Sequence, residues 1–265
     1  MRRYSYILVD PLSSFGSDHE LRRVLAVLKA CGYEGVELNL TEPAGIDLNR
    51  LEQGITDHGL VIPAFLTGAA YQQGLCFSSP DKGIRQRAVQ RLIGYLDIAK
   101  RFHALLVIGL LQGQFSDEPN PDSANRRIAD CLCDVAAIAE ERGIELVLEP
   151  VNHLQVGFNN SVSEVCQMVQ TVGSPALSPM VDTMHMNIEE HSLIQPILEC
   201  GSALRHVHLC ESNGSLFGTG HLDFAAVLGA LDTIGYEGFV SVKVYRGMSV
   251  EEGARSSMDY LRKWV

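Results

Sequence analysis

The chain has 265 residues, of which 46% are hydrophobic, and this length suits one α/β barrel or two small domains. We take the simpler interpretation, a single domain over residues 1–265. The formal net charge of −11 argues against a nucleic-acid partner, because proteins that track phosphates present a basic face. Every apolar run is shorter than the roughly 20 residues that cross a bilayer, so we expect a cytoplasmic protein with a small-molecule ligand and no membrane partner.

Strand-like apolar runs and helical patterns alternate along the chain. The strand candidates are residues 4–9, 35–40, 60–65, 104–108, 144–148, 180–181, 204–209 and 239–244. The helical patterns cover residues 17–30, 48–58, 79–102, 125–142, 161–172, 190–200, 224–234 and 251–264. This order favours a (β/α)8 TIM barrel, although patterning alone leaves a doubly wound open sheet as the alternative.

Some boundaries are less regular than others. Ser17 is a suitable N-cap for the first helix, and Gly32 stands just past its end. Pro63 is awkward inside the third strand because it has no backbone N–H. Residues 113–123 contain two prolines and several polar residues, and their composition predicts a loop.

Three of the predicted strands end in side chains that suit a divalent cation. The fifth strand runs into Glu149, the sixth into Asp182, and the seventh carries His208 near its end. The C-terminal ends of the strands of a parallel barrel converge on one pocket, even when tens of residues separate them in sequence. We therefore expect these three side chains to meet at the barrel mouth.

The same stretches resemble the xylose isomerase-like TIM-barrel superfamily, in its branch of ketose 3-epimerases, hydroxypyruvate isomerases and inosose dehydratases. The matching motifs are Leu-Glu-Pro-Val-Asn at 148–152, Asp-Thr-Met-His-Met-Asn at 182–187, His-Val-His-Leu-Cys-Glu-Ser-Asn at 206–213 and Gly-Thr-Gly-His-Leu-Asp-Phe at 218–224. The resemblance spans the whole chain and is more specific for the superfamily than for the substrate. It implies a sugar substrate, free or phosphorylated, and a homodimer or homotetramer.

The resemblance also implies roles for individual residues. Glu149, Asp182 and His208 match three of the family's four metal ligands, and oxygen ligands with one imidazole suit Mn or Mg, with Zn also possible. We predict that five further residues contact the substrate: His185, His153, Glu211, Asn213 and Glu37. For Glu37, a buried hydrogen-bonding role is the alternative. We interpret His206 as structural and expect it on the opposite strand face from His208.

Lys243 stands where the family has a second glutamate as its fourth metal ligand. Two arrangements satisfy the charge of such a site. In the first, the lysine ammonium takes the place of the cation between Glu149 and Asp182. In the second, a metal is bound and drives Lys243 toward its neutral form, which accepts a proton. We favour the second arrangement, with Glu149 and Lys243 as the acid/base pair.

These residues predict a metal-dependent isomerase or epimerase that acts on a ketose or keto-sugar through an enediolate. Two alternatives stay open: a lyase or dehydratase acting on an inosose or 3-keto-glycoside, and a sugar-binding barrel that has lost turnover. Gly214 and Gln155 stand where the epimerases carry an arginine and a glutamate that contact the substrate. These departures, together with Lys243, are the reason for keeping both alternatives.

Overall fold

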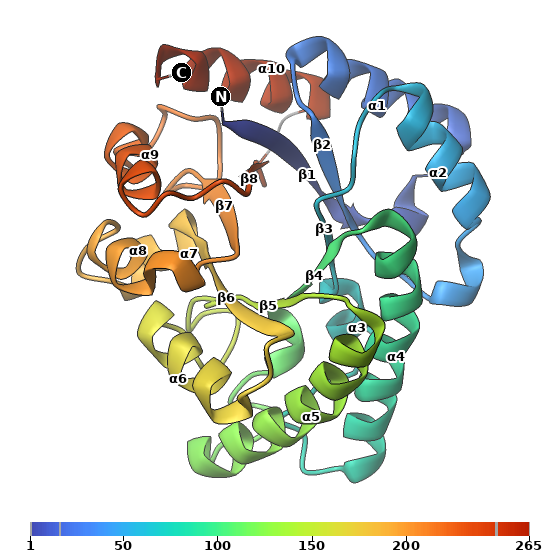
Figure 1. The fold of residues 1–265 in the computed structure, drawn as a ribbon, viewed down its shortest axis with the longest axis vertical. Helices are drawn as coiled ribbons and strands as arrows, with labels where there is room; N and C mark the ends of the chain where they lie inside the picture. Colours follow the sequence, from blue (N-terminus) through green and yellow to red (C-terminus); the bar gives the residue numbers. More distant parts are fainter. Residues whose placement is uncertain (1, 16, 247–248, 265) are drawn as a thin grey trace.

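A closed parallel barrel forms the centre of the molecule (Figure 1). The computed structural model describes residues 2–15, 17–246 and 249–264. Within them, eight strands pair with their sequence neighbours, and β8 closes the barrel against β1. The strands are β1 (Arg3–Pro11), β2 (Gly35–Asn39), β3 (Ala64–Leu66), β4 (Leu105–Ile108), β5 (Leu146–Leu148), β6 (Leu177–Asp182), β7 (His206–Cys210) and β8 (Phe239–Lys243). The predicted (β/α)8 fold is confirmed, and the open sheet is excluded.

Helices surround the barrel, and both termini lie near α10 in Figure 1. They are α1 (Asp18–Cys31), α2 (Leu48–Asp57), α3 (Gly68–Gln72), α4 (Lys82–Phe102), α5 (Pro121–Arg142), α6 (Val162–Val172), α7 (Thr183–Glu189), α8 (Gln195–Cys200), α9 (Phe224–Thr233) and α10 (Val250–Leu261). As predicted, Ser17 caps α1 by accepting a hydrogen bond from Glu20, and Gly32 ends it in a left-handed conformation. Within the described ranges, each helix is too short or too polar to span a bilayer.

The predicted helix over residues 190–200 is confirmed only in its C-terminal half. The chain forms α7 directly after β6 instead, and α8 begins only at Gln195. Pro196 occupies the first turn of α8, where its missing N–H has no intrahelical partner to lose. A helix that started at residue 190 would place this proline in its interior, which is unfavourable by about 3 kcal/mol.

Prolines also explain two shifted boundaries. Helix α5 starts at Pro121, inside the predicted loop, because proline suits the first helical position. The Asn120 side chain caps this start by accepting a hydrogen bond from Ser123 N at 2.9 Å. Strand β3 starts at Ala64, just after Pro63. In the predicted third strand, Val61 forms only an isolated bridge to β2.

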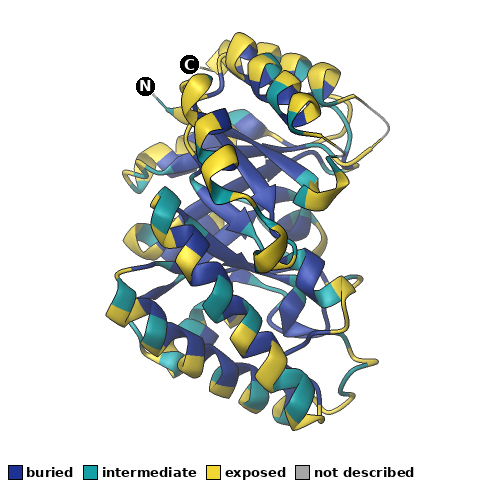
Figure 2. Cartoon of the chain, turned by 90° about the vertical axis from the view of Figure 1, so that its right-hand side faces the viewer, coloured by how far each residue is buried: buried dark blue, intermediate teal, exposed yellow. Residues whose placement is uncertain are grey.

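The barrel interior is divided into an apolar and a polar part. Figure 2 shows the strands buried and the outer helix faces exposed. Strands β3 to β6 contribute the apolar layer, Ala64, Val107, Val147 and Met180. Strands β1, β2, β7 and β8 contribute the buried polar side chains Ser5, Glu37, His206, His208 and Ser241. The polar part includes His208, which lies near the C-terminal end of β7.

Candidate active site at the barrel mouth

Five polar side chains meet at the C-terminal ends of β5 to β8. The Nζ atom of Lys243 lies 2.9 Å from Asp182 Oδ2 and 3.6 Å from Glu149 Oε1. The Nδ1 atom of His208 lies 3.3 Å from the same Glu149 oxygen. The Nε2 atom of His185 lies 3.8 Å from Glu149 Oε1 and 3.9 Å from Asp182 Oδ2. The predicted convergence of the strand ends is confirmed, and Lys243 faces the cluster.

Strand register explains why these residues meet. Asp182 pairs with His208 across β6 and β7, and Lys243 pairs with Cys210 across β7 and β8. Glu149 follows β5 directly. A Cβ atom at Gly109, just after β4, would lie 2.4 Å from Glu149 Oε2. The absence of a side chain at this glycine therefore leaves room for the Glu149 carboxylate.

Asp182 serves both the cluster and the helix that follows it. Its Oδ1 atom accepts hydrogen bonds from the backbone N–H groups of Met184 and His185 and so caps α7. Its Oδ2 atom accepts a hydrogen bond from Lys243. The cap therefore orients the carboxylate and also fixes the backbone that carries His185.

The charges of the cluster stabilise one another in a buried setting. Burial by itself raises the pKa of Glu149, but Lys243 and His208 outweigh this effect and hold the pKa at about 2. The pKa of Asp182 is also held well below its usual value, against its own burial, with Lys243 as the main cause. Burial lowers the pKa of Lys243, yet Asp182 foremost holds it well above the ordinary value. Without a further cation, the two carboxylates are ionised and the lysine is an ammonium.

Two atoms of the cluster fit a divalent cation. Glu149 Oε1 and His208 Nδ1 are buried and have no hydrogen-bond partner. Together with Asp182 they offer three ligand atoms within 4.8 Å of one another. His208 Nε2 lies 3.1 Å from Glu37 Oε2, so Nε2–H donates to this carboxylate and Nδ1 is the atom turned to Glu149 and Asp182. Against burial, the neighbouring carboxylates, Glu37 foremost, hold the pKa of His208 well above its usual value, so a metal would bind at Nδ1 by displacing its proton. These residues therefore fit the metal that the family resemblance implies.

Glu37 lies in the barrel interior beneath the cluster. Its Oε1 atom is 2.8 Å from His206 Nε2, and the hydroxyl of Ser241 also donates to Oε1. Because β2 and β7 are not neighbours in the barrel, this contact crosses the interior. Glu37 is fully buried, and both of its oxygens are engaged, so its placement favours the alternative role as a hydrogen-bonding partner over contact with the substrate.

The expectation that His206 and His208 face opposite sides of the strand was wrong. Both rings point inward to Glu37, and their centroids are 5.1 Å apart. Successive side chains of a strand alternate, so residues two apart share a face. His206 nevertheless has only buried protein partners in the interior, in agreement with its predicted structural role.

Replacing Glu37 with glutamine is expected to destabilise the protein by about 3–5 kcal/mol, because the variant breaks a buried ionic network. The pKa of Glu37 lies well below its usual range because His206 and His208 outweigh burial. Its stabilising contribution is therefore full above the unfolded carboxyl pKa and is lost as the pH falls through the folded value. Urea unfolding followed by circular dichroism at several acidic pH values measures both effects.

Glu34→Gln, at an exposed position just before β2, is the matched control and should change stability by less than about 0.5 kcal/mol. A Glu37→Gln variant as stable as this control would contradict the ionic role of Glu37.

The other predicted substrate residues lie in loops and have hydrogen-bond partners outside the cluster. His153 is exposed, and its Nδ1 atom lies 2.6 Å from Glu189 Oε1. Asn213 is exposed and donates to Thr219. Glu211 is fully buried and accepts hydrogen bonds from three backbone N–H groups, those of Ser212, Gly218 and Leu222. Glu211 therefore organises the loop after β7, and its oxygens are engaged there.

Asn152 was missed as a functional candidate. It is 1% exposed, and its Nδ2 atom lies 2.7 Å from His185 Nδ1. The sequence feature that could have identified it is its place in the Leu-Glu-Pro-Val-Asn motif at 148–152, which also contains Glu149. Tyr245 was missed as well: its ring centroid lies 4.9 Å from Lys243 Nζ, which places the aromatic ring over the ammonium.

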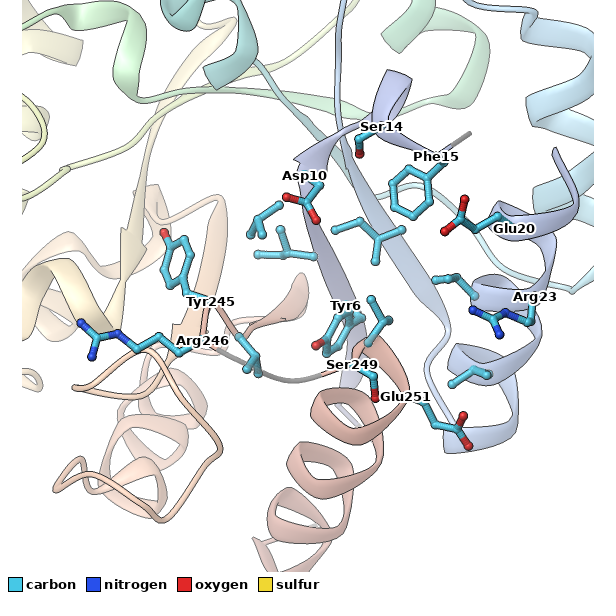
Figure 3. Close-up of a pocket in the computed structure, with 17 residues that line it drawn as sticks. Tyr6, Asp10, Ser14, Phe15, Glu20, Arg23, Tyr245, Arg246, Ser249 and Glu251 are labelled. Atoms are coloured by element: carbon cyan, nitrogen blue, oxygen red, sulfur yellow. The ribbon is translucent and has the colours of Figure 1, made fainter. Parts of the chain in front are cut away.

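A separate cavity of about 730 Å³ lies between β1, α1 and the start of α10. Figure 3 shows Glu20 and Arg23 of α1 on one side and Tyr245 and Arg246 on the other. Its lining carries charges of both signs and none of the five cluster residues. Tyr245 is the link between this cavity and the cluster, because it also contacts Lys243.

The fold and the cluster define a parallel (β/α)8 barrel with carboxylate, imidazole and amine groups at its C-terminal mouth, where barrel enzymes carry their active sites. The chain belongs to the family described as xylose isomerase-like TIM barrel, which matches residues 25–264.

Similar proteins include several sugar epimerases. L-ribulose 3-epimerase of Mesorhizobium japonicum is 30% identical over 247 residues, which are 91% of this chain and 80% of that protein. Ketose 3-epimerase of Arthrobacter globiformis is 29% identical over 213 residues, covering 79% of this chain and 72% of the relative. A solved structure of L-ribulose 3-epimerase aligns with a TM-score of 0.88 at 25% identity, covering 100% of this chain and 94% of the other.

Proposed function

We propose that this protein is a metal-dependent epimerase of a ketose or related keto-sugar, free or phosphorylated. The observation that carries the proposal is one buried cluster in which unpartnered ligand atoms and two proton-transfer groups adjoin. The relatives named as ketose and L-ribulose 3-epimerases support the reaction class. The expected cytoplasmic location, the single domain over residues 1–265 and a homodimer or homotetramer are part of the same proposal.

Glu149, Asp182 and His208 would hold the metal, with Mn, Mg or Zn as candidates. When bound, such an ion polarises a carbonyl oxygen and stabilises negative charge on it. Within this setting Glu149 removes the proton from the carbon next to the substrate carbonyl. Lys243, at the end of β8 with Nζ 3.6 Å from Glu149 Oε1, returns a proton from its ammonium form to the same carbon. His185 donates a hydrogen bond to a substrate oxygen from the Nε2 side, which faces the carboxylates.

Lys243 determines the charge of this arrangement. The two carboxylates and the ammonium together carry one net negative charge, which is less than the three carboxylates of the usual family site supply. A neighbouring dication lowers the pKa of an amine, so a bound metal would make the Lys243 ammonium a readier proton donor, and the neutral amine left after donation is the proton acceptor for the reverse reaction. The acid and base roles of the two residues then follow the direction of the reaction.

The lyase and the inactive sugar-binding barrel are less well supported. The relatives reported above are named as epimerases, and the cluster retains groups for both removal and return of a proton. The lyase would instead release a leaving group from the same enolate.

The test uses protein stripped with a chelator and reloaded with Mn²⁺, then incubated with L-ribulose or D-psicose in deuterated water. We expect NMR to show deuterium at C3 of the recovered sugar and growth of its C3 epimer, because the proton is exchanged with solvent at the enediolate stage. A control sample kept in chelator should show neither signal.

An unsaturated or deoxy product would identify the lyase. Sugar binding without deuterium incorporation would identify the inactive barrel.

A further inference from the structure

The side chain of Asn152 has a defined orientation. Its Oδ1 atom accepts a hydrogen bond from the backbone N–H of Leu154 at 3.1 Å. A backbone N–H can only donate, so the oxygen must lie on that side of the amide. The other amide atom, Nδ2, therefore faces His185 Nδ1 at 2.7 Å, and this assignment follows from the hydrogen-bond partners.

An amide NH₂ group can only donate a hydrogen bond, and this fixes the form of the imidazole. His185 Nδ1 must present a lone pair to Asn152, so the neutral ring carries its proton on Nε2. Nε2 is the atom that faces Glu149 and Asp182. His185 is 1% exposed, and because the Asn152 amide can only donate in this contact, Nδ1 carries no proton.

We propose that Asn152 is a positioning residue that holds His185 in the Nε2–H tautomer, so that the ring presents a hydrogen-bond donor to the substrate. This inference rests on the proposed function for its catalytic consequence but not for the tautomer. It gives the two imidazoles of the cluster opposite duties. Glu37 engages Nε2 of His208 and leaves Nδ1 as the ligand atom toward the cavity, whereas Asn152 leaves His185 with an N–H toward it.

Asn152→Asp is the sharpest variant, because it keeps the shape of the side chain and an oxygen for Leu154 N–H. Its second oxygen replaces the amide nitrogen and demands a proton on His185 Nδ1. The neutral ring then loses its Nε2 proton and becomes an acceptor toward the cavity. We expect ¹⁵N NMR of labelled imidazoles, at a pH above the usual histidine pKa, to show the Nε2–H form in the wild type and the Nδ1–H form in the variant.

The signal of His185 is assigned by its disappearance in His185→Gln. Gln155→Glu, which adds a negative charge to the same loop, is the control and should leave the wild-type tautomer in place. A wild-type protein with the Nδ1–H form, or an Asn152→Asp variant that keeps the Nε2–H form, would overturn the proposal.

The catalytic consequence is measured separately. Asn152→Asp should lower kcat about 100-fold, as expected for loss of one donor to a developing oxyanion. In a His185→Gln background the same change should have little further effect, because the glutamine donor does not depend on a tautomer. Full additivity of the two changes would contradict the assigned pathway through His185.

If the tautomers are as expected but no sugar is epimerised, the proposed function fails while the positioning role of Asn152 stands.

Discussion

Replacing Glu149 with glutamine is expected to lower kcat/KM for epimerisation by at least about 1000-fold, because it removes both a proton acceptor and a charged metal ligand. The loss of one negative ligand should also weaken Mn²⁺ binding at least about 100-fold. Isothermal titration calorimetry and the deuterium-exchange assay measure the two effects on the same samples. The wild-type protein should gain thermal stability with rising Mn²⁺ concentration, and the variant should not.

Glu145→Gln provides the matched control for Glu149. Glu145 precedes the same strand at the opposite end of the barrel and forms a half-exposed ion pair with Arg205. Such pairs contribute about 0–1 kcal/mol, so this variant should retain activity and metal affinity. Activity of Glu149→Gln above a tenth of the wild-type value would show that another group removes the proton.

Replacing Lys243 with methionine should separate metal binding from turnover. The variant removes a positive charge from a buried site that also receives a dication, so Mn²⁺ affinity should rise at least about tenfold. Epimerisation should nevertheless fall by about 100-fold to 10,000-fold, because the proton-transfer group is lost. In the presence of chelator the variant should unfold more readily, since the Asp182 and Glu149 carboxylates lose their buried partner.

Lys100→Met, on an exposed face of α4, is the control and should leave metal affinity and turnover unchanged. Methionine at position 243 with unaltered turnover would remove Lys243 from the acid/base pair. Lys243→Glu adds a separate test, because it restores the residue expected from the family resemblance. A gain of turnover on common ketoses would favour the view that the natural chain is a barrel with reduced activity.

The fold and the centre of the site could be predicted because their signals are local. Apolar runs that end in Glu149, Asp182 and His208 point to strand ends, and barrel geometry brings strand ends together. Lys243 was also placed correctly, since its strand pattern fixes the face it presents.

The features that the sequence did not predict are a short helix and a contact between distant segments. Helix α7 has 7 residues, and its first turn is organised by Asp182, a residue that already belongs to β6. Such a short helix has too few turns for a periodic pattern. Glu37 meets His206 across the barrel, 169 positions away in sequence, so only the closed structure reveals the pair. The error on the face of His206 had a simpler cause, because strand periodicity already placed it with His208.

The double use of Asp182 has a consequence for engineering the specificity of this protein. One of its oxygens accepts a hydrogen bond from the first turn of α7, and the other accepts one from Lys243. The position of the helix and the geometry of the site therefore depend on the same side chain. A graft of the α7 segment from a homologue would therefore shift His185 and the carboxylate together. Such a graft should take residues 182–189 as one cassette, including the Asp182 cap, and should leave the supporting β7 strand untouched.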